Sequence, residues 1–140
     1  MILGQTLTTT PEDQYRALLE STAFGARTII ESFRDSGVEI NELVVAGGLT
    51  KNTFLMQLFC DICRVPLSVG TIKQPGAHGS AVFAAVAADL YPDVKAASAA
   101  MGAKKAGVYQ IDEQRAEQYD ALYAEYARLH DYFGRGGNQV

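Results

Sequence analysis

The stretch "ELVVAGGLTKNTFLMQLFCDIC", from Glu42 to Cys63, decides the fold of this 140-residue chain. Its apolar residues 43–46 predict a short buried strand, and the residues after Asn52 follow the helical period. Gly47 and Gly48 lie between these two elements. Ligands of open α/β sheets bind beyond the carboxyl ends of the strands, and glycine lets a nucleotide lie against the backbone. A nucleotide site and a tight strand-to-helix turn without a ligand both explain the stretch, which matches no P-loop and no G-x-G-x-x-G pattern.

The rest of the chain supplies further helices and a second strand. The first helix is predicted between an N-cap at Thr10, followed by Pro11, and a stop at Gly37. Helical periodicity predicts further helices over residues 52–64, 78–91, 94–102 and 112–134, a second strand is expected over residues 66–71, and residues 107–111 are expected to be extended. In the helix over residues 52–64, the inward positions are Phe54, Leu55, Leu58, Phe59 and Ile62.

The fold class follows from the alternation of strands and helices, which predicts an α/β arrangement with short parallel strands. Two strands make a very small sheet, and a buried strand such as residues 43–46 needs neighbours on both sides. We therefore expect that part of the sheet is missing from this chain or is supplied by a second copy. An unpaired strand edge invites strand addition, so a homodimer through the exposed sheet edge is one expectation.

Composition narrows the classes of partner. The net charge of −4 gives no indication of binding to nucleic acid or to an anionic membrane surface. No segment is apolar enough to span a bilayer, and "MILGQTLTTT" lacks the basic and hydrophobic regions of a signal peptide. Two cysteines do not make a disulfide framework, so we expect a cytoplasmic protein.

The cysteines and histidines do not form a reactive site in the sequence. Cys60 and Cys63 are spaced as C-x-x-C, but they fall in the middle of a predicted helix without a second pair of zinc ligands, so we expect them to be buried and structural. His78 is expected to cap or line a turn, and His130 to pack on the last helix. No catalytic residue and no metal site are therefore predicted.

Two segments resemble the carboxy-terminal lobe of the FGGY carbohydrate kinases: "AGGLTKNTFLMQLFCDICRVPL" at residues 46–67 and "PGAHGSAVFAAVAA" at residues 75–88. That family carries a Gly-Gly turn, an Asn before an apolar helix, an Asp near the end of that helix, a Pro before the next strand, and a GAxGSA or GAxGAA run. The matching residues are Gly47, Gly48, Asn52, Asp61, Pro66, Gly76, Ala77, Gly79, Ser80 and Ala81. Residues 4–33 and 119–138 are similar as well.

The resemblance implies an actin-like, ribonuclease-H-like α/β fold of two lobes that hold ATP and Mg²⁺ in the cleft between them. By position, Gly47 and Gly48 would lie against the adenosine and the α-phosphate. Leu49 and Asn52 would border the adenine, and Asn52 could hydrogen-bond its edge. The small residues of the helix that begins near His78 would allow close contact with a counterpart helix at the lobe hinge.

The departures from the family are large. Whole FGGY kinases are several times longer, and the sugar site, a phosphate-binding turn, the general base and a leading strand hairpin all precede the region matched here. Residues 1–140 are thus expected to be a fragment, the nucleotide-binding carboxy-terminal lobe, inactive alone and able to bind a sugar only with the amino-terminal lobe. The "LHDYFGRG" segment at residues 129–136 is most similar to the members that phosphorylate L-ribulose in arabinose breakdown, with xylulose or glycerol kinases as alternatives.

Overall fold

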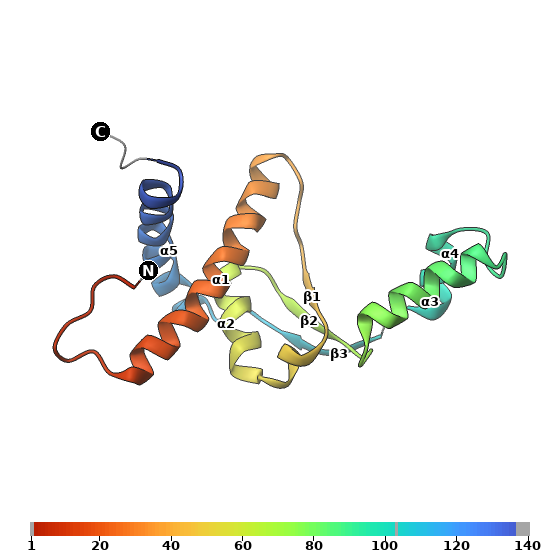
Figure 1. Cartoon of the computed structure of the whole chain (residues 1–140), viewed down its shortest axis with the longest axis horizontal. Helices are drawn as coiled ribbons and strands as arrows, with labels where there is room; N and C mark the ends of the chain where they lie inside the picture. Colours follow the sequence, from red (N-terminus) through yellow and green to blue (C-terminus); the bar gives the residue numbers. More distant parts are fainter. Residues whose placement is uncertain (1, 103, 137–140) are drawn as a thin grey trace.

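The computed structural model describes residues 2–102 and 104–136, so the predicted domain of residues 1–140 extends past the described part (Figure 1). The elements follow in the order α1 (Pro11–Asp35), β1 (Leu43–Val45), the 3-10 helix η1 (Gly48–Lys51), α2 (Thr53–Cys63), β2 (Leu67–Gly70), α3 (Pro75–Ala87), α4 (Val94–Met101), β3 (Lys105–Tyr109) and α5 (Glu113–Gly134). No helix among these residues combines the length and the apolarity that crossing a bilayer requires.

Local capping chemistry sets the ends of the long helices. Thr10 and Asp13 form a capping box at the start of α1, in which each side chain accepts a hydrogen bond from the backbone N–H of the other residue. The chain leaves α1 through Gly37, whose φ of +81° favours glycine. Asp112 caps α5 by accepting the backbone N–H of Arg115. The predicted limits of these two helices are therefore confirmed to within a few residues.

The described residues form a sheet of three strands in the order β1-β2-β3. β1 and β2 are parallel, with Leu43 opposite Leu67, and this confirms the predicted parallel pairing. The segment expected only to be extended forms β3, which pairs antiparallel to β2 with Tyr109 opposite Leu67. β2 leads into α3 and α4, and β3 returns from them, so the two strands run in opposite directions. The sheet is therefore mixed rather than wholly parallel.

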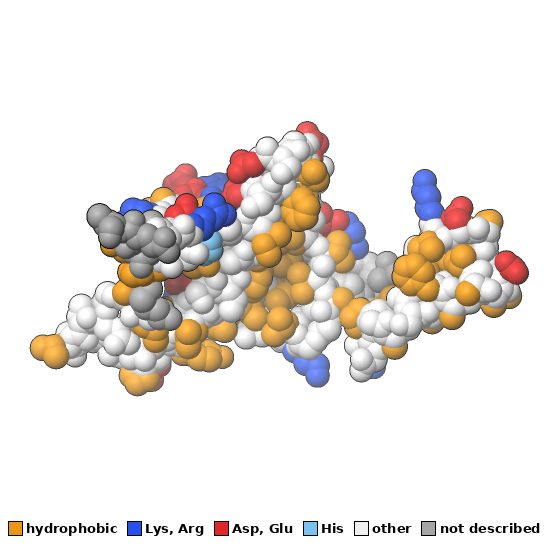
Figure 2. Space-filling view, turned by 45° about the horizontal axis from the view of Figure 1, so that its top comes forward, with side chains coloured by type: hydrophobic (Ala, Val, Ile, Leu, Met, Phe, Trp, Pro, Cys, Tyr) orange, Lys and Arg blue, Asp and Glu red, His pale blue; other side chains and the backbone are white. Residues whose placement is uncertain are grey.

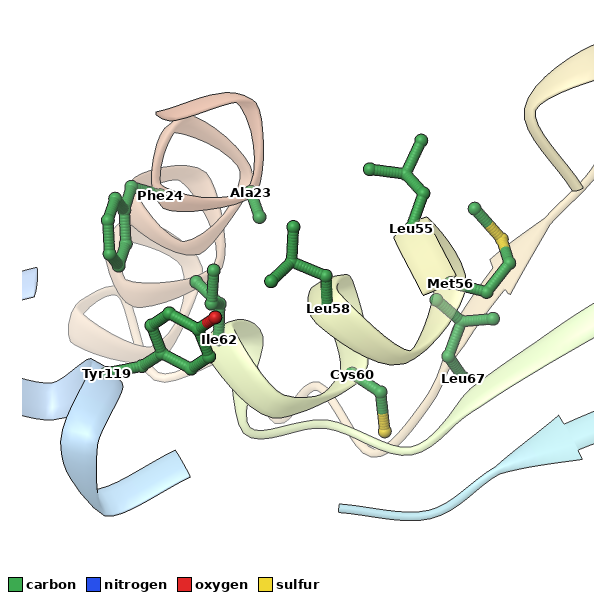
Figure 3. Close-up of a cluster of buried hydrophobic side chains, with 9 residues drawn as sticks. All are labelled: Ala23, Phe24, Leu55, Met56, Leu58, Cys60, Ile62, Leu67 and Tyr119. Carbon is green, nitrogen blue, oxygen red and sulfur yellow. The ribbon is translucent and has the colours of Figure 1, made fainter. Parts of the chain in front are cut away.

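α2 covers one face of the sheet through contacts with β2 and β3, and α1 and α5 pack against α2. The core lies among these three helices and the sheet. Figure 3 shows Leu58 and Ile62 of α2 between α1, which supplies Ala23 and Phe24, and Tyr119 of α5. The Phe24 ring meets the Tyr119 ring edge-on, with 6.2 Å between the ring centroids. We call the sheet together with α1, α2 and α5 the body, and these contacts make α2 its central helix.

The opposite face of the sheet is largely uncovered. Val44 and Val108 are 64% and 54% exposed, whereas Ser68 between them is completely buried. Lys105 reaches across this face to Glu42, with 2.6 Å between Nζ and Oε1, and the Ser68 hydroxyl donates a hydrogen bond to the same carboxylate. β1 has no strand partner on its outer side among the described residues, as expected for a sheet that needs a further neighbour.

α3 and α4 pack on each other and project away from the body; we call these two helices the arm (Figure 1). Figure 2 shows hydrophobic side chains exposed along the arm as well as in the centre of the body. Ser80, Ala81 and Ala84 are exposed, so in the described part of the chain these three small residues of α3 face no counterpart helix, whereas Ala85 is buried. Phe83 of the same helix is 63% exposed.

Candidate functional site

A cavity of about 810 Å³ opens where the two parallel strands end. Gly47 and Gly48 follow β1, Gly70 ends β2, and all three line the cavity. Parallel neighbours present their carboxyl ends at the same edge of a sheet, which is where open α/β sheets bind ligands. The predicted glycine turn therefore lies at a cavity in the position that the fold favours for a ligand.

Backbone geometry explains the first glycine of this turn. Gly47 has φ +96° and ψ −162°, a conformation open to glycine and strained for other residues. Its carbonyl oxygen accepts hydrogen bonds from the backbone N–H of Thr50 at 3.3 Å and from the Thr50 hydroxyl at 2.7 Å. A Cβ atom on Gly48 would meet no atom within 4 Å. Gly47 thus shapes the turn, and Gly48 leaves open space beside it.

The other two predicted site residues lie next to the cavity rather than in its lining. Leu49 is 62% exposed on η1. The Asn52 side-chain oxygen Oδ1 accepts the backbone N–H of Leu55 at 3.0 Å and so caps α2. The side-chain NH₂ group of Asn52 is distinct from this acceptor and remains a potential donor to a ligand. The structure brings Gly47 and Gly48 into the cavity and leaves Leu49 and Asn52 on its border.

Sequence reasoning missed several polar residues of the cavity. Thr50 and Lys51 come from η1, and Thr71 and Lys73 come from the connection between β2 and α3. The lining includes no aspartate or glutamate, although the chain as a whole has a net charge of −4. Lys51 lies inside the motif and could have been found there. The position of Lys73 depends on the pairing of β1 with β2.

Burial of the two cysteines confirms that they are structural. Both thiols are free and fully buried. Burial raises the pKa of Cys60 to about 11 and the pKa of Cys63 to about 12. Cys60 donates a hydrogen bond to the carbonyl oxygen of Tyr109 at 3.4 Å, which links α2 to β3. Because the thiolate is the reactive form, neither cysteine is suited to redox or metal chemistry at neutral pH.

Neither histidine lines the cavity at the ends of β1 and β2, and the two lie in different parts of the fold. His78, in the first turn of α3, lines a separate apolar cavity of about 280 Å³ between the uncovered face of the sheet and the arm. His130 stacks on Tyr126, with 6.2 Å between the ring centroids. Within residues 2–102 and 104–136, no group of three or more His, Cys, Asp or Glu side chains is placed to hold a metal ion.

Comparison with known proteins gives one family. The model of the carboxy-terminal domain of the FGGY family of carbohydrate kinases matches residues 1–88. A ribulokinase of Mycolicibacterium smegmatis is 53% identical over 135 residues, which are 96% of this chain and 24% of the relative. A ribulokinase of Shouchella clausii is 47% identical over 145 residues, covering 100% of this chain and 26% of the relative. The chain thus spans about a quarter of the length of these curated relatives.

Solved structures share the fold. A xylulose kinase from Rhodospirillum rubrum superimposes with a TM-score of 0.77 at 23% identity, over 94% of this chain and 27% of that protein. A Plasmodium falciparum glycerol kinase, solved with ADP, gives a TM-score of 0.70 at 26% identity, over 92% of this chain and 26% of that protein. These superpositions cover more of the chain than the 88 residues matched by the family model.

Proposed function

The chain belongs to the FGGY family of carbohydrate kinases, and from this premise we propose that it is the nucleotide-binding part of an ATP-dependent ribulokinase. The proposed reaction transfers the γ-phosphoryl group of ATP to L-ribulose and yields L-ribulose 5-phosphate and ADP. The observation that carries the proposal is the high identity to ribulokinases over almost the entire chain. Xylulose and glycerol kinases are the alternatives within the family, but their solved structures have lower identity to this chain.

The cavity at the ends of β1 and β2 is the proposed nucleotide site. Gly47 and Gly48 would lie against the adenosine and the α-phosphate, because a turn without side chains admits close approach of a ligand. Leu49 supplies an exposed apolar surface for the adenine. Asn52 can donate a hydrogen bond from its side-chain NH₂ group while its oxygen caps α2.

The proposed contribution of this chain is positioning rather than proton transfer. Phosphoryl transfer depends on alignment of donor and acceptor and on stabilisation of charge. The cavity lining contains no carboxylate that could act as a general base or bind Mg²⁺, so its residues do not form a site for that ion. The sugar and the general base would belong to the longer protein, and we expect residues 1–140 alone to show no turnover of L-ribulose with MgATP. We also propose a cytoplasmic location, where a reducing environment suits two free cysteines.

Calorimetric titration of ADP and of MgATP into the chain tests the nucleotide site. We expect saturable binding to the wild type and loss of binding in Gly48→Val, because the added side chain enters open space and leaves the fold intact. Ala100→Val is the control, since it places the same valine side chain at an exposed position of α4. A folded wild type that binds neither nucleotide, or equal binding by Gly48→Val, would overturn the proposal.

A second candidate function is a non-catalytic module that dimerises through the outer edge of β1. The observation in its favour is the position of β1 at the edge of the sheet, with Val44 exposed. Size-exclusion chromatography with light scattering should then give a dimer, and Val44→Lys should convert it to a monomer. A wild type that is monomeric at every concentration would contradict this candidate and leave the nucleotide site unaffected.

A further inference from the structure

We propose that Lys51 and Lys73 bind the phosphate groups of the nucleotide in the cavity at the ends of β1 and β2. This inference rests on the proposed nucleotide site and adds to it the residues that would neutralise the charge of the ligand. Lys51 ends η1, which follows β1, and Lys73 lies between β2 and α3. Both residues line the same cavity. Two loops that are separate in the sequence thus each bring one lysine to a single site.

Lys51 and Lys73 belong to the four lysines that form no ion pair among the described residues, and of these four they are the two that line the cavity. Eight of the twelve basic side chains form ion pairs: all seven arginines and Lys105. Lys51 and Lys73 pair with no acidic group of the described residues, and the lining of their cavity contains none. The charge of this lining is therefore positive in a chain whose net charge is negative. A local excess of this kind attracts an anion.

Thr71, another residue of the cavity lining, has a hydroxyl group that can donate a hydrogen bond to an anion. Thr71 lines the cavity, and its hydroxyl oxygen accepts the backbone N–H of Lys104 at 3.2 Å. Its own O–H is thus available to donate. Each lysine ammonium supplies three donors and a positive charge, and hydrogen bonds between charged partners are stronger than those between neutral ones. The combination suits the closely spaced oxygens of a diphosphate or triphosphate better than a neutral ligand.

Titration of ADP and of adenosine into single variants tests the inference. Lys51→Ala and Lys73→Ala should each weaken ADP binding by about fivefold to tenfold, as expected for loss of one charge-assisted contact that is partly exposed to water. Adenosine affinity should change by less than about twofold, because adenosine has no phosphate. Lys95→Ala is the matched control: Lys95 is an exposed lysine of α4, outside the lining of the cavity, and ADP affinity should not change. Lys51→Arg should retain most of the affinity, since it keeps the charge.

The outcomes separate this inference from the proposed site. Wild-type affinity for ADP in both Lys51→Ala and Lys73→Ala would overturn the phosphate contacts and leave the nucleotide site in place. An equal loss of ADP and adenosine binding would also overturn them, because the lysines would then act on the fold or on the adenosine part of the site. A folded wild type that binds neither ligand would overturn the nucleotide site and the inference together.

Discussion

The buried carboxylate of Asp61 accepts the backbone N–H of Asp112, the residue that caps α5, in a hydrogen bond of 2.9 Å. The same oxygen accepts the side-chain amide of Gln57 at 2.7 Å, and the other oxygen lies 3.1 Å from Nε of Arg115. The Asp61 side chain is only 2% exposed. The Asp61 carboxylate thus links the start of α5 to α2, the helix that follows the glycine turn.

Asp61→Ala should be strongly destabilising. The variant leaves the N–H of Asp112 without its buried acceptor and removes one of the two carboxylate partners of the half-exposed Arg115, which still pairs with Asp112. Loss of a buried acceptor costs about 2 to 3 kcal/mol. Urea unfolding at neutral pH measures the loss of free energy of unfolding. Glu117→Ala removes an exposed carboxylate of α5 and serves as control, with an expected change below about 0.5 kcal/mol. Equal effects of the two substitutions would show that the buried contacts do not contribute to stability.

Two substitutions at Arg64 separate the effect of backbone strain on stability from the effect of ion pairing. It follows α2 with φ +51°, which costs a non-glycine residue about 1 kcal/mol, and it pairs with Asp120 at 2.7 Å and with Glu113 at 2.8 Å. Arg64→Ala keeps the strain and loses both pairs, whereas Arg64→Gly loses the pairs but relieves the strain. We expect Arg64→Ala to be less stable than Arg64→Gly by about 1 kcal/mol in thermal or urea unfolding. The reverse order would mean that the left-handed conformation is not strained here.

Stability should fall in acid partly through Asp120. Hydrogen bonding from Arg64, assisted by Arg27, lowers the pKa of Asp120 from its ordinary value of 3.8, although partial burial opposes the shift. A carboxyl whose folded pKa is lowered stabilises the fold above its unfolded pKa, and this contribution is lost as the pH falls through the folded value. Between about pH 6 and about pH 3, Asp120→Asn should therefore lose less free energy of unfolding than the wild type. Parallel losses in the two proteins would exclude this contribution.

The two cysteines should be protected from thiol reagents. Their raised pKa values and their burial predict that the chromogenic reagent DTNB reacts at about pH 8 on the order of 100-fold more slowly with the native chain than with the urea-unfolded chain. An added Ala100→Cys thiol on the exposed side of α4 should react at once and report on reagent activity. Rapid reaction of Cys60 or Cys63 in the native chain would indicate local opening around α2.

Local chemistry made most of the helices predictable. The N-cap roles of Thr10 and Asp112 depend on residues three apart, so the sequence alone predicts them. Asn52 was expected to border the adenine, and its N-cap role was not predicted. Helical periodicity was less reliable at Phe54, which was expected inward but is 50% exposed, while Met56 is buried. The guanidinium of Arg16 lies 6.0 Å from the centroid of the Phe54 ring, so the ring packs at the surface. Periodicity marks a face of a helix without saying how far the core extends around it.

The features that the sequence did not predict depend on contacts between residues that are distant in the sequence. β3 joins the sheet by pairing with β2, which lies more than thirty residues earlier, and its short sequence carries no signal for a partner. Gly47 and Gly48 were found because the strand, the turn and the helix are consecutive. Lys73 reaches the same cavity only because β1 and β2 end side by side. The glycine turn could thus be predicted from one segment, whereas the charge of the cavity required the fold.

The projecting arm has a thermodynamic consequence. Among its described residues only Val82, Ala85 and Ala97 are buried, so opening the arm would expose little apolar surface that is now hidden from water. Local opening should therefore need much less free energy than unfolding of the body around α2. Any molecule that binds the arm and holds it in one orientation must offset the conformational entropy that the arm loses. Association through this part of the chain will be weaker than its contact area alone suggests.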